Sequence, residues 1–156
     1  MKDRFDLSGI GGPVLVSACL LGVSCRYDGT TRRCAYITGL HDVHLVPVCP
    51  EQLGGLPTPR PSARLEGGDG AAVVRGEAGV VDASGRDVTG AILHGARQVC
   101  LLAGLMGVRL AILKERSPSC ATHEVWTTGG LTRGLGVTAA MLRDMGIAVV
   151  NEDADE

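Results

Sequence analysis

Three cysteines stand where short apolar runs of the chain end. They are Cys19 after Pro13–Ala18, Cys49 after His44–Val48, and Cys120 in the Ser-Pro-Ser-Cys segment that follows Leu110–Leu113. Such runs predict buried parallel strands, whose carboxyl ends meet at one edge of a sheet. Open α/β sheets bind their ligands at that edge. Three converging thiolates suit a soft metal centre, either zinc or an iron–sulfur cluster, with one coordination position left open for catalysis.

The alternative is that each cysteine is a small buried side chain. Free cysteine is among the most buried residue types, and no local Cys-x-x-Cys spacing indicates a zinc ribbon or a thioredoxin-type pair. Cys25, six residues after Cys19, is either a fourth ligand or a spare thiol beside the site. For Cys34 and Cys100 we expect ordinary packing roles. Residue types alone therefore leave metal binding and core packing both open.

Glu51 and Ser117 are polar side chains within three residues of Cys49 and Cys120. Glu51 follows Cys49 by two residues, where a carboxylate beside a metal can act as general base for water. Its structural alternative is to cap backbone N–H groups of the loop. Ser117 precedes Cys120 by three residues and either presents its hydroxyl to the pocket or forms a turn.

Three arginines fall in loops at the same expected edge. Arg26, Arg60 and Arg116 either pair with nearby carboxylates or bind an anionic substrate, and we expect structural pairing. No Gly-x-Gly-x-x-Gly follows a strand and no phosphate-loop lysine is present, which disfavours nucleotide cofactors.

The elements that must position these residues alternate between strand and helix. Apolar periodicity predicts a long helix that starts after the N-cap Asp87 and ends at Gly107, and a second helix over Val137–Met145. A weak helix is expected across Arg32–Leu40, and Ile147–Val150 predicts a fourth strand. This alternation predicts an α/β fold with a small Rossmann-like, mainly parallel sheet and flanking helices.

The remaining segments are predicted to be less regular. The four prolines of Pro50–Pro61 favour a rigid loop over the site, and Ala71–Asp82 alternates as a short β-hairpin would. Residues 121–135 are expected to be a glycine-rich connection, residues 1–12 a loose lead-in and residues 151–156 a mobile acidic tail.

Length and composition narrow the class of protein. A chain of 156 residues predicts a single domain over 1–156, and an aromatic content of 3% predicts an aliphatic core. The net charge of -2, without a basic block, argues against a nucleic-acid polymer as partner. Neither a signal peptide nor an apolar run of membrane-spanning length is found, so we expect a cytoplasmic protein without a membrane partner. Six cysteines in that reducing compartment are not expected to form disulfides.

Several blocks in the same order resemble the thiouracil desulfidase family. They are Ser17–Gly22, Cys25–Gly29, Pro47–Glu51, Gly54–Arg60, Asp87–Thr89, Leu113–Cys120 and Gly134–Ala140. The resemblance spans about Val14 to Val150. It departs from the family pattern at Ala121, where members usually have glycine after Ser-Pro-Ser-Cys; this matters for the loop if the position needs a positive φ.

The resemblance implies a cytoplasmic enzyme that removes sulfur from thiolated uracil without net redox change. A [4Fe–4S] cluster would be bound by Cys19, Cys49 and Cys120, with the fourth iron free for the substrate's sulfur. Glu51 would activate water and Ser117 would move protons or orient the ring, and the partner would be a small thiolated pyrimidine. Cys25 in place of one ligand stays open. Two rival interpretations are a non-catalytic zinc or iron–sulfur binding or sensing module, and a metal-free cysteine-nucleophile enzyme of sulfur transfer.

Overall fold

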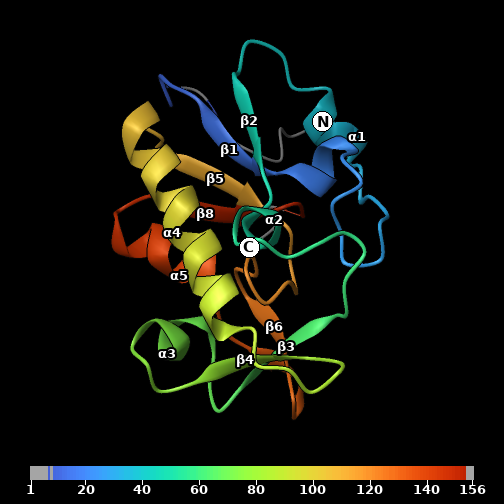
Figure 1. Ribbon diagram of the computed structural model, residues 1–156. Coiled ribbons are helices and arrows are strands. Elements are labelled where there is room, and N and C mark those ends of the chain that lie inside the picture. The colour runs from blue at the N-terminus through green and yellow to red at the C-terminus, as the bar shows by residue number, and fades with distance from the viewer. Residues whose placement is uncertain (1–6, 8, 154–156) are drawn as a thin grey trace.

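The main sheet has four parallel strands in the order β2-β1-β5-β8 (Figure 1). The computed structural model describes residue 7 and residues 9–153 of the chain. The strands are β1 Val14–Ser17, β2 Leu45–Val48, β5 Leu110–Leu113 and β8 Ala148–Asn151. All side chains of the two central strands are buried, because a parallel sheet is covered on both faces. The fold class predicted from the apolar runs is confirmed.

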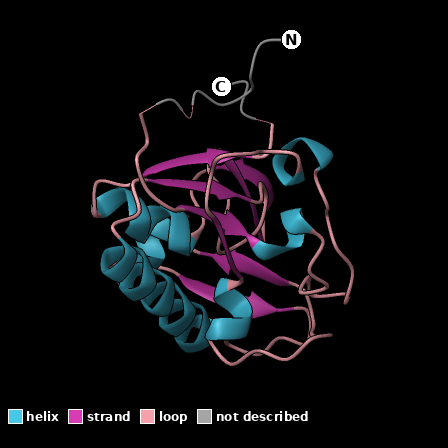
Figure 2. Ribbon diagram, turned by 90° about the horizontal axis from the view of Figure 1, so that it is seen from above, coloured by secondary structure: helices cyan, strands magenta, loops and turns pink. Residues whose placement is uncertain are grey.

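Helices cover the main sheet on both faces. On one face Leu15 and Leu113 pack with Val99 of α4 Thr89–Met106 and Leu142 of α5 Val137–Asp144. On the other face Val14, Val16 and Ile112 pack with Ile37 of α1 Ala35–Thr38. Figure 2 shows α4 as the long helix running along one side of the stacked strands. The short helices are η1 Ala18–Leu21, α1 Ala35–Thr38, α2 Pro50–Leu53 and α3 Gly70–Val74.

Both predicted helices on the α4–α5 face are present. Helix α4 begins at Thr89 with Val88 at the N-cap, one residue later than the predicted Asp87, whose carboxylate accepts the N–H of Thr89 at 2.9 Å. Gly107 ends α4 in the left-handed region, at φ 66°. The weak helix expected across Arg32–Leu40 shortens to the single turn of α1.

A second sheet, in the order β4-β3-β6-β7, lies below the main sheet in Figure 1. Its strands are β3 Ala63–Glu66, β4 Gly79–Asp82, β6 Glu124–Thr127 and β7 Gly130–Arg133. Strand β3 pairs antiparallel with β4 and parallel with β6, and β6 and β7 form a hairpin. This sheet forms the lower part of the molecule beneath the carboxyl ends of the main strands.

The hairpin prediction over Ala71–Asp82 is wrong in its first arm. Residues Gly70–Val74 form helix α3, because Asp69 caps its N-terminus by accepting the N–H of Ala72 at 3.1 Å. Residues 79–82 do form a strand, but its partner is β3. The connection expected over residues 121–135 is also more regular than predicted, since it contains the β6–β7 hairpin.

Helix α2 crosses α4 through two glycines. A Cβ built on Gly95 of α4 would lie 1.8 Å from the carbonyl oxygen of Pro50, and one on Gly54 would lie 2.1 Å from that of Ala91. No side chain larger than hydrogen fits at either position. The backbone of α2, which follows Cys49 and carries Glu51, is therefore held directly against α4.

The C-terminal segment differs from a mobile tail where it is described. Asn151, assigned to the tail, closes β8, and Glu152 accepts the ammonium of Lys114 at 2.7 Å. Residues 1–6, 8 and 154–156 lie outside the described residues. Within the described part, no helix has both the length and the apolar character needed to cross a bilayer.

Candidate functional site

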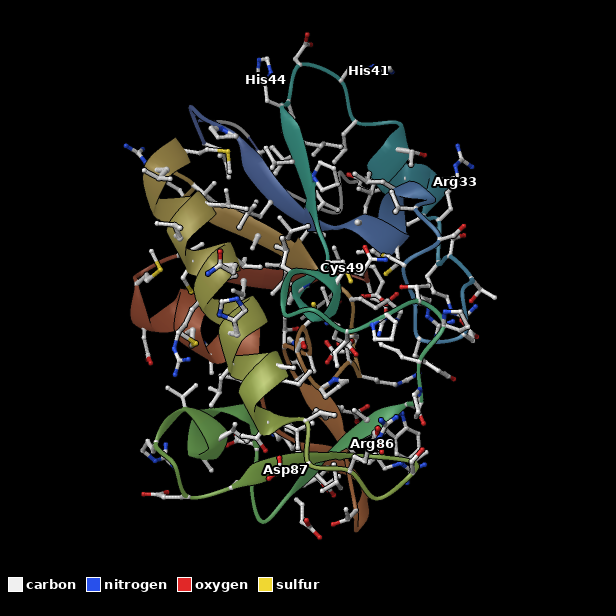
Figure 3. All side chains as sticks on the ribbon, viewed as in Figure 1. Arg33, His41, His44, Cys49, Arg86 and Asp87 are labelled. Carbon is white, nitrogen blue, oxygen red and sulfur yellow. The ribbon has the colours of Figure 1, made fainter. Side chains whose placement is uncertain are left out.

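The three cysteines predicted as ligands line one cavity of about 470 Å³. Cys19 lies in η1 directly after β1, Cys49 precedes α2 directly after β2, and Cys120 lies in the loop after β5. Because β2, β1 and β5 are neighbours and run parallel, their carboxyl ends deliver the three side chains to the same edge. Figure 3 labels Cys49 where β2 meets α2, whereas His41 and His44 lie at the opposite end of β2.

Cys25 joins these cysteines in the cavity. It is buried, at 2% exposure, and its carbonyl oxygen lies 3.8 Å from Cys49 Sγ. Its thiol hydrogen-bonds to Cys19, which raises the pKa of Cys25. Cys34 and Cys100, for which we expected packing roles, do not belong to the described cavity lining. The cavity thus gathers four thiols.

Without a cation, raised pKa values hold the thiols of Cys25, Cys49 and Cys120 in the protonated form. Burial raises the pKa of Cys120 to about 12, and hydrogen bonds from the hydroxyls of Ser17 and Ser117 offset part of the rise. A hydrogen bond with Cys25, followed by burial, raises the pKa of Cys49. A bound cation would reverse this preference, because thiolates are stabilised by positive charge and metal binding releases their protons.

Glu51 points to the same cavity and is fixed by Arg60. The guanidinium Nε donates to Glu51 Oε1 at 3.2 Å, with side-chain exposures of 4% for the arginine and 14% for the glutamate. The remaining donors of Arg60 bind the carbonyl of Cys25 at 2.9 Å, the carbonyl of Pro57 at 3.1 Å and the hydroxyl of Thr58 at 3.0 Å. One buried cation therefore joins the glutamate, the cysteine loop and the proline-rich loop. The structural pairing expected for Arg60 is present.

Ser117 organises the loop that carries Cys120. Its Oγ accepts the backbone N–H groups of Ser119 and Cys120, each at 3.1 Å, and its hydroxyl also bonds to the Cys120 sulfur. Ser117 therefore has both of the roles predicted as alternatives: it forms a turn, and it lines the cavity. The other loop arginines also line the cavity and pair with carboxylates, Arg26 with Asp28 at 3.8 Å and Arg116 with Glu124 at 3.8 Å.

Glu115 is a structural residue that the sequence argument missed. Its carboxylate accepts the N–H groups of Thr122, His123 and Glu124 at 3.0–3.1 Å, and the Asn151 amide at 2.7 Å. Burial works against its ionisation, but these hydrogen bonds outweigh burial and lower the pKa of Glu115 to about 2. Glu115 thereby ties the segment after Cys120 to the end of β5 and β8. No sequence signal beyond its place after β5 pointed to this role.

The donor atoms that the cysteines bring to the cavity are sulfurs. Across the described residues, no group of three His, Cys, Asp or Glu side chains is arranged to hold a single metal ion. A cavity lined by four thiols, with no histidine beside them, matches the soft donors of an iron–sulfur centre.

Comparison with known proteins decides the family. The model of the 2-thiouracil desulfurase family matches residues 14–154. The chain belongs to this enzyme family. The thiouracil desulfidase resemblance found in the sequence is confirmed. Among curated proteins, the uncharacterized protein YbbK of Bacillus subtilis (strain 168) is 41% identical over 144 residues, covering 90% of this chain and 95% of YbbK.

A solved structure gives the same answer for this 2-thiouracil desulfurase family member. The [4Fe-4S]-dependent thiouracil desulfidase TudS superposes with a TM-score of 0.78 at 38% identity, covering 91% of each chain. The [4Fe-4S] cofactor named for TudS is the one that the family resemblance implied. At Ala121, where glycine was expected, the backbone needs no glycine, because the described non-glycine residues with positive φ are Asp42 and Arg116. The side chain of Ala121 is fully buried in the core under β6.

Proposed function

We propose that this protein hydrolyses the carbon–sulfur bond of a thiolated uracil, giving uracil and sulfide without net redox change. The observation that carries the proposal is the meeting of Cys19, Cys49 and Cys120 in one cavity with the partly buried carboxylate of Glu51. Membership of the 2-thiouracil desulfurase family and the likeness to TudS support it.

Cys19, Cys49 and Cys120 would hold a [4Fe–4S] cluster. When bound, the cluster supplies an iron without a protein ligand, a Lewis acid for the thiocarbonyl sulfur. The raised pKa values of Cys49 and Cys120 mean that loading displaces protons from these thiols. Cys25 lies close enough to exchange roles with one of the three, and our proposal keeps it as an unligated neighbour.

Glu51 would act as general base. Its carboxylate takes a proton from water as the oxygen adds to the ring carbon that bears sulfur, and the carbon–sulfur bond then breaks. Arg60 fixes Oε1 of this carboxylate at 3.2 Å, so that its orientation is set before substrate arrives. Ser117, whose oxygen accepts two backbone N–H groups and whose hydroxyl bonds to the Cys120 sulfur, would turn this hydroxyl to the substrate. There it would orient the ring or relay to the leaving sulfur the proton that Glu51 takes from water.

A turnover assay on anaerobically reconstituted protein tests the proposal. We expect uracil and sulfide to form in equal amounts from 2- or 4-thiouracil, with no added reductant or oxidant. Glu51→Gln should keep the iron and acid-labile sulfide and lose at least about a hundredfold in kcat, whereas Glu77→Gln, an exposed glutamate far from the cavity lining, should match the wild type. Loaded wild-type protein that leaves both thiouracils unchanged would contradict the proposal.

The same assay separates the two rival functions. A binding or sensing module would hold metal without turnover. A metal-free cysteine nucleophile would work without iron and be blocked by thiol alkylation. A small thiolated pyrimidine as substrate and a cytoplasmic location are retained as part of the proposal.

A further inference from the structure

Aromatic side chains are scarce in this chain, yet two of its four line the cavity. They are Trp126, its sole tryptophan, and Tyr27. The core is aliphatic, so packing does not require an indole at this place. Trp126 is 41% exposed, whereas its neighbour Val125 is fully buried. A large flat apolar surface is therefore held open to the cavity.

Strand geometry puts Arg64 beside Trp126. Leu65 of β3 lies opposite Thr127 of β6, so Arg64 and Trp126, one residue earlier on each parallel strand, are also neighbours. Leu65 and Val125 point into the core, which leaves Arg64 and Trp126 on the opposite face. The Arg64 guanidinium carbon lies 5.3 Å from the centre of the indole ring, a cation–π contact. Within the described part of the chain, no carboxylate pairs with Arg64.

The pair and the cysteines belong to one cavity but come from different sheets. Cys19, Cys49 and Cys120 extend from the carboxyl edge of the main sheet, and Arg64 and Trp126 lie on the second sheet. A planar ring bound in this cavity meets thiols from one sheet and a flat indole–guanidinium surface from the other. Indole and guanidinium planes are the side-chain surfaces on which nucleobases stack.

We propose that the Trp126–Arg64 pair is the surface on which the substrate ring stacks while its sulfur faces the cysteines. The site then selects flat heteroaromatic thiocarbonyl compounds over puckered ones with the same polar groups. This inference rests on the proposed function and deepens it by assigning the residues that choose the substrate. Trp126 contributes binding, and the bond-breaking step remains with the groups around the cysteines.

Intrinsic fluorescence tests the stacking without turnover. Trp126 is the sole fluorescent indole, so its emission reports on this surface alone. Titration of the loaded protein with uracil should change the emission saturably. 5,6-Dihydrouracil, which carries the same carbonyl and N–H groups on a puckered ring, should bind at least about tenfold more weakly. Equal affinity for the two compounds, or no response to uracil, would overturn the inference.

Kinetics of three variants complete the test. Trp126→Ala should raise KM for thiouracil by about 5- to 100-fold, because the substrate ring loses the indole on which it stacks. The value of kcat should stay nearly unchanged. Trp126→Phe should restore most of the affinity. The matched control is Leu131→Ala, which removes the exposed side chain opposite Trp126 on β7, outside the described cavity lining. An unchanged KM in Trp126→Ala, or the same rise in Leu131→Ala, would overturn the stacking role.

The two failures are distinguishable. If wild-type protein turns over thiouracil but Trp126→Ala keeps its KM and its preference over dihydrothiouracil, the stacking inference is wrong and the proposed function stands. If the wild type does not turn over thiouracil, the proposed function is wrong, and the uracil titration still decides whether Trp126 stacks on a flat ring.

Discussion

Gly95→Ala tests whether helix α4 sets the position of Cys49 and Glu51. The new Cβ would lie 1.8 Å from the Pro50 carbonyl oxygen, while real Cβ contacts stay beyond about 3.0 Å. Helix α2 must therefore move by about 1.2 Å, the difference between these distances, because the obstructing atom belongs to backbone. Overpacking of this kind costs about 1–3 kcal/mol of folding free energy. A displacement near 1 Å at a reacting group costs about a hundredfold in rate.

The matched control is Gly104→Ala in the same helix. The nearest atom to its Cβ would be the Met145 methyl at 3.8 Å, an ordinary contact. Alanine should stabilise α4 there by about 0.5–1 kcal/mol through its higher helix propensity. Urea unfolding and kcat for thiouracil are measured for both variants. The reasoning is refuted if Gly95→Ala gains stability as Gly104→Ala does and keeps full turnover.

Three further predictions concern single side chains of the site. Arg60→Ala should lower the free energy of unfolding by about 3 kcal/mol, because the partly buried Glu51 carboxylate is left without its partner; urea midpoints equal to the wild type would contradict this. Cys25→Ser should retain the full iron content after reconstitution, whereas loss equal to that of Cys19→Ser would make Cys25 a ligand. The pKa of Glu115 lies at about 2, below the ordinary value of 4.5, so its contribution to stability is complete above pH 4.5 and is lost as pH falls toward 2. Glu115→Gln should be less stable than the wild type at pH 7 and lose less stability between these pH values; parallel stability curves would be inconsistent with this role.

Much of the main sheet could be predicted from sequence because buried parallel strands read as short apolar runs. The runs before Cys19, Cys49 and Cys120 correspond to β1, β2 and β5, and their shared carboxyl edge follows from parallel pairing. The apolar period of residues 88–106 likewise indicated α4. Apolar runs and apolar periods are local patterns, so a few consecutive residues are enough to reveal them in the sequence.

The second sheet was mostly missed because its signals are short and mixed. Ala71–Val74 is an apolar run that fits strand and helix equally, and the cap at Asp69 decided for the helix. Strand β6 alternates over four residues with one buried side chain, Val125, and a glycine turn follows it. Runs of this length do not separate a strand from a loop.

The contacts that complete the site are tertiary and have no local signal. Arg60 reaches Glu51 because the intervening proline-rich loop turns back on itself, and Glu115 collects donors from a segment seven to nine residues away. The sequence predicted that the loop arginines pair with nearby carboxylates, but it did not identify which carboxylate each arginine contacts. The Trp126–Arg64 pair depends on the register of β3 with β6, which no motif encodes.

The iron and acid-labile sulfide bound per chain test the central claim most directly. They are measured after anaerobic reconstitution of Cys19→Ser, Cys49→Ser and Cys120→Ser, with Cys100→Ser, outside the described cavity lining, as the control. The account predicts four irons per chain for the control, as for any [4Fe–4S] centre, and a depleted or lost cluster in each of the three variants. A full cluster with full desulfuration in Cys120→Ser would contradict it.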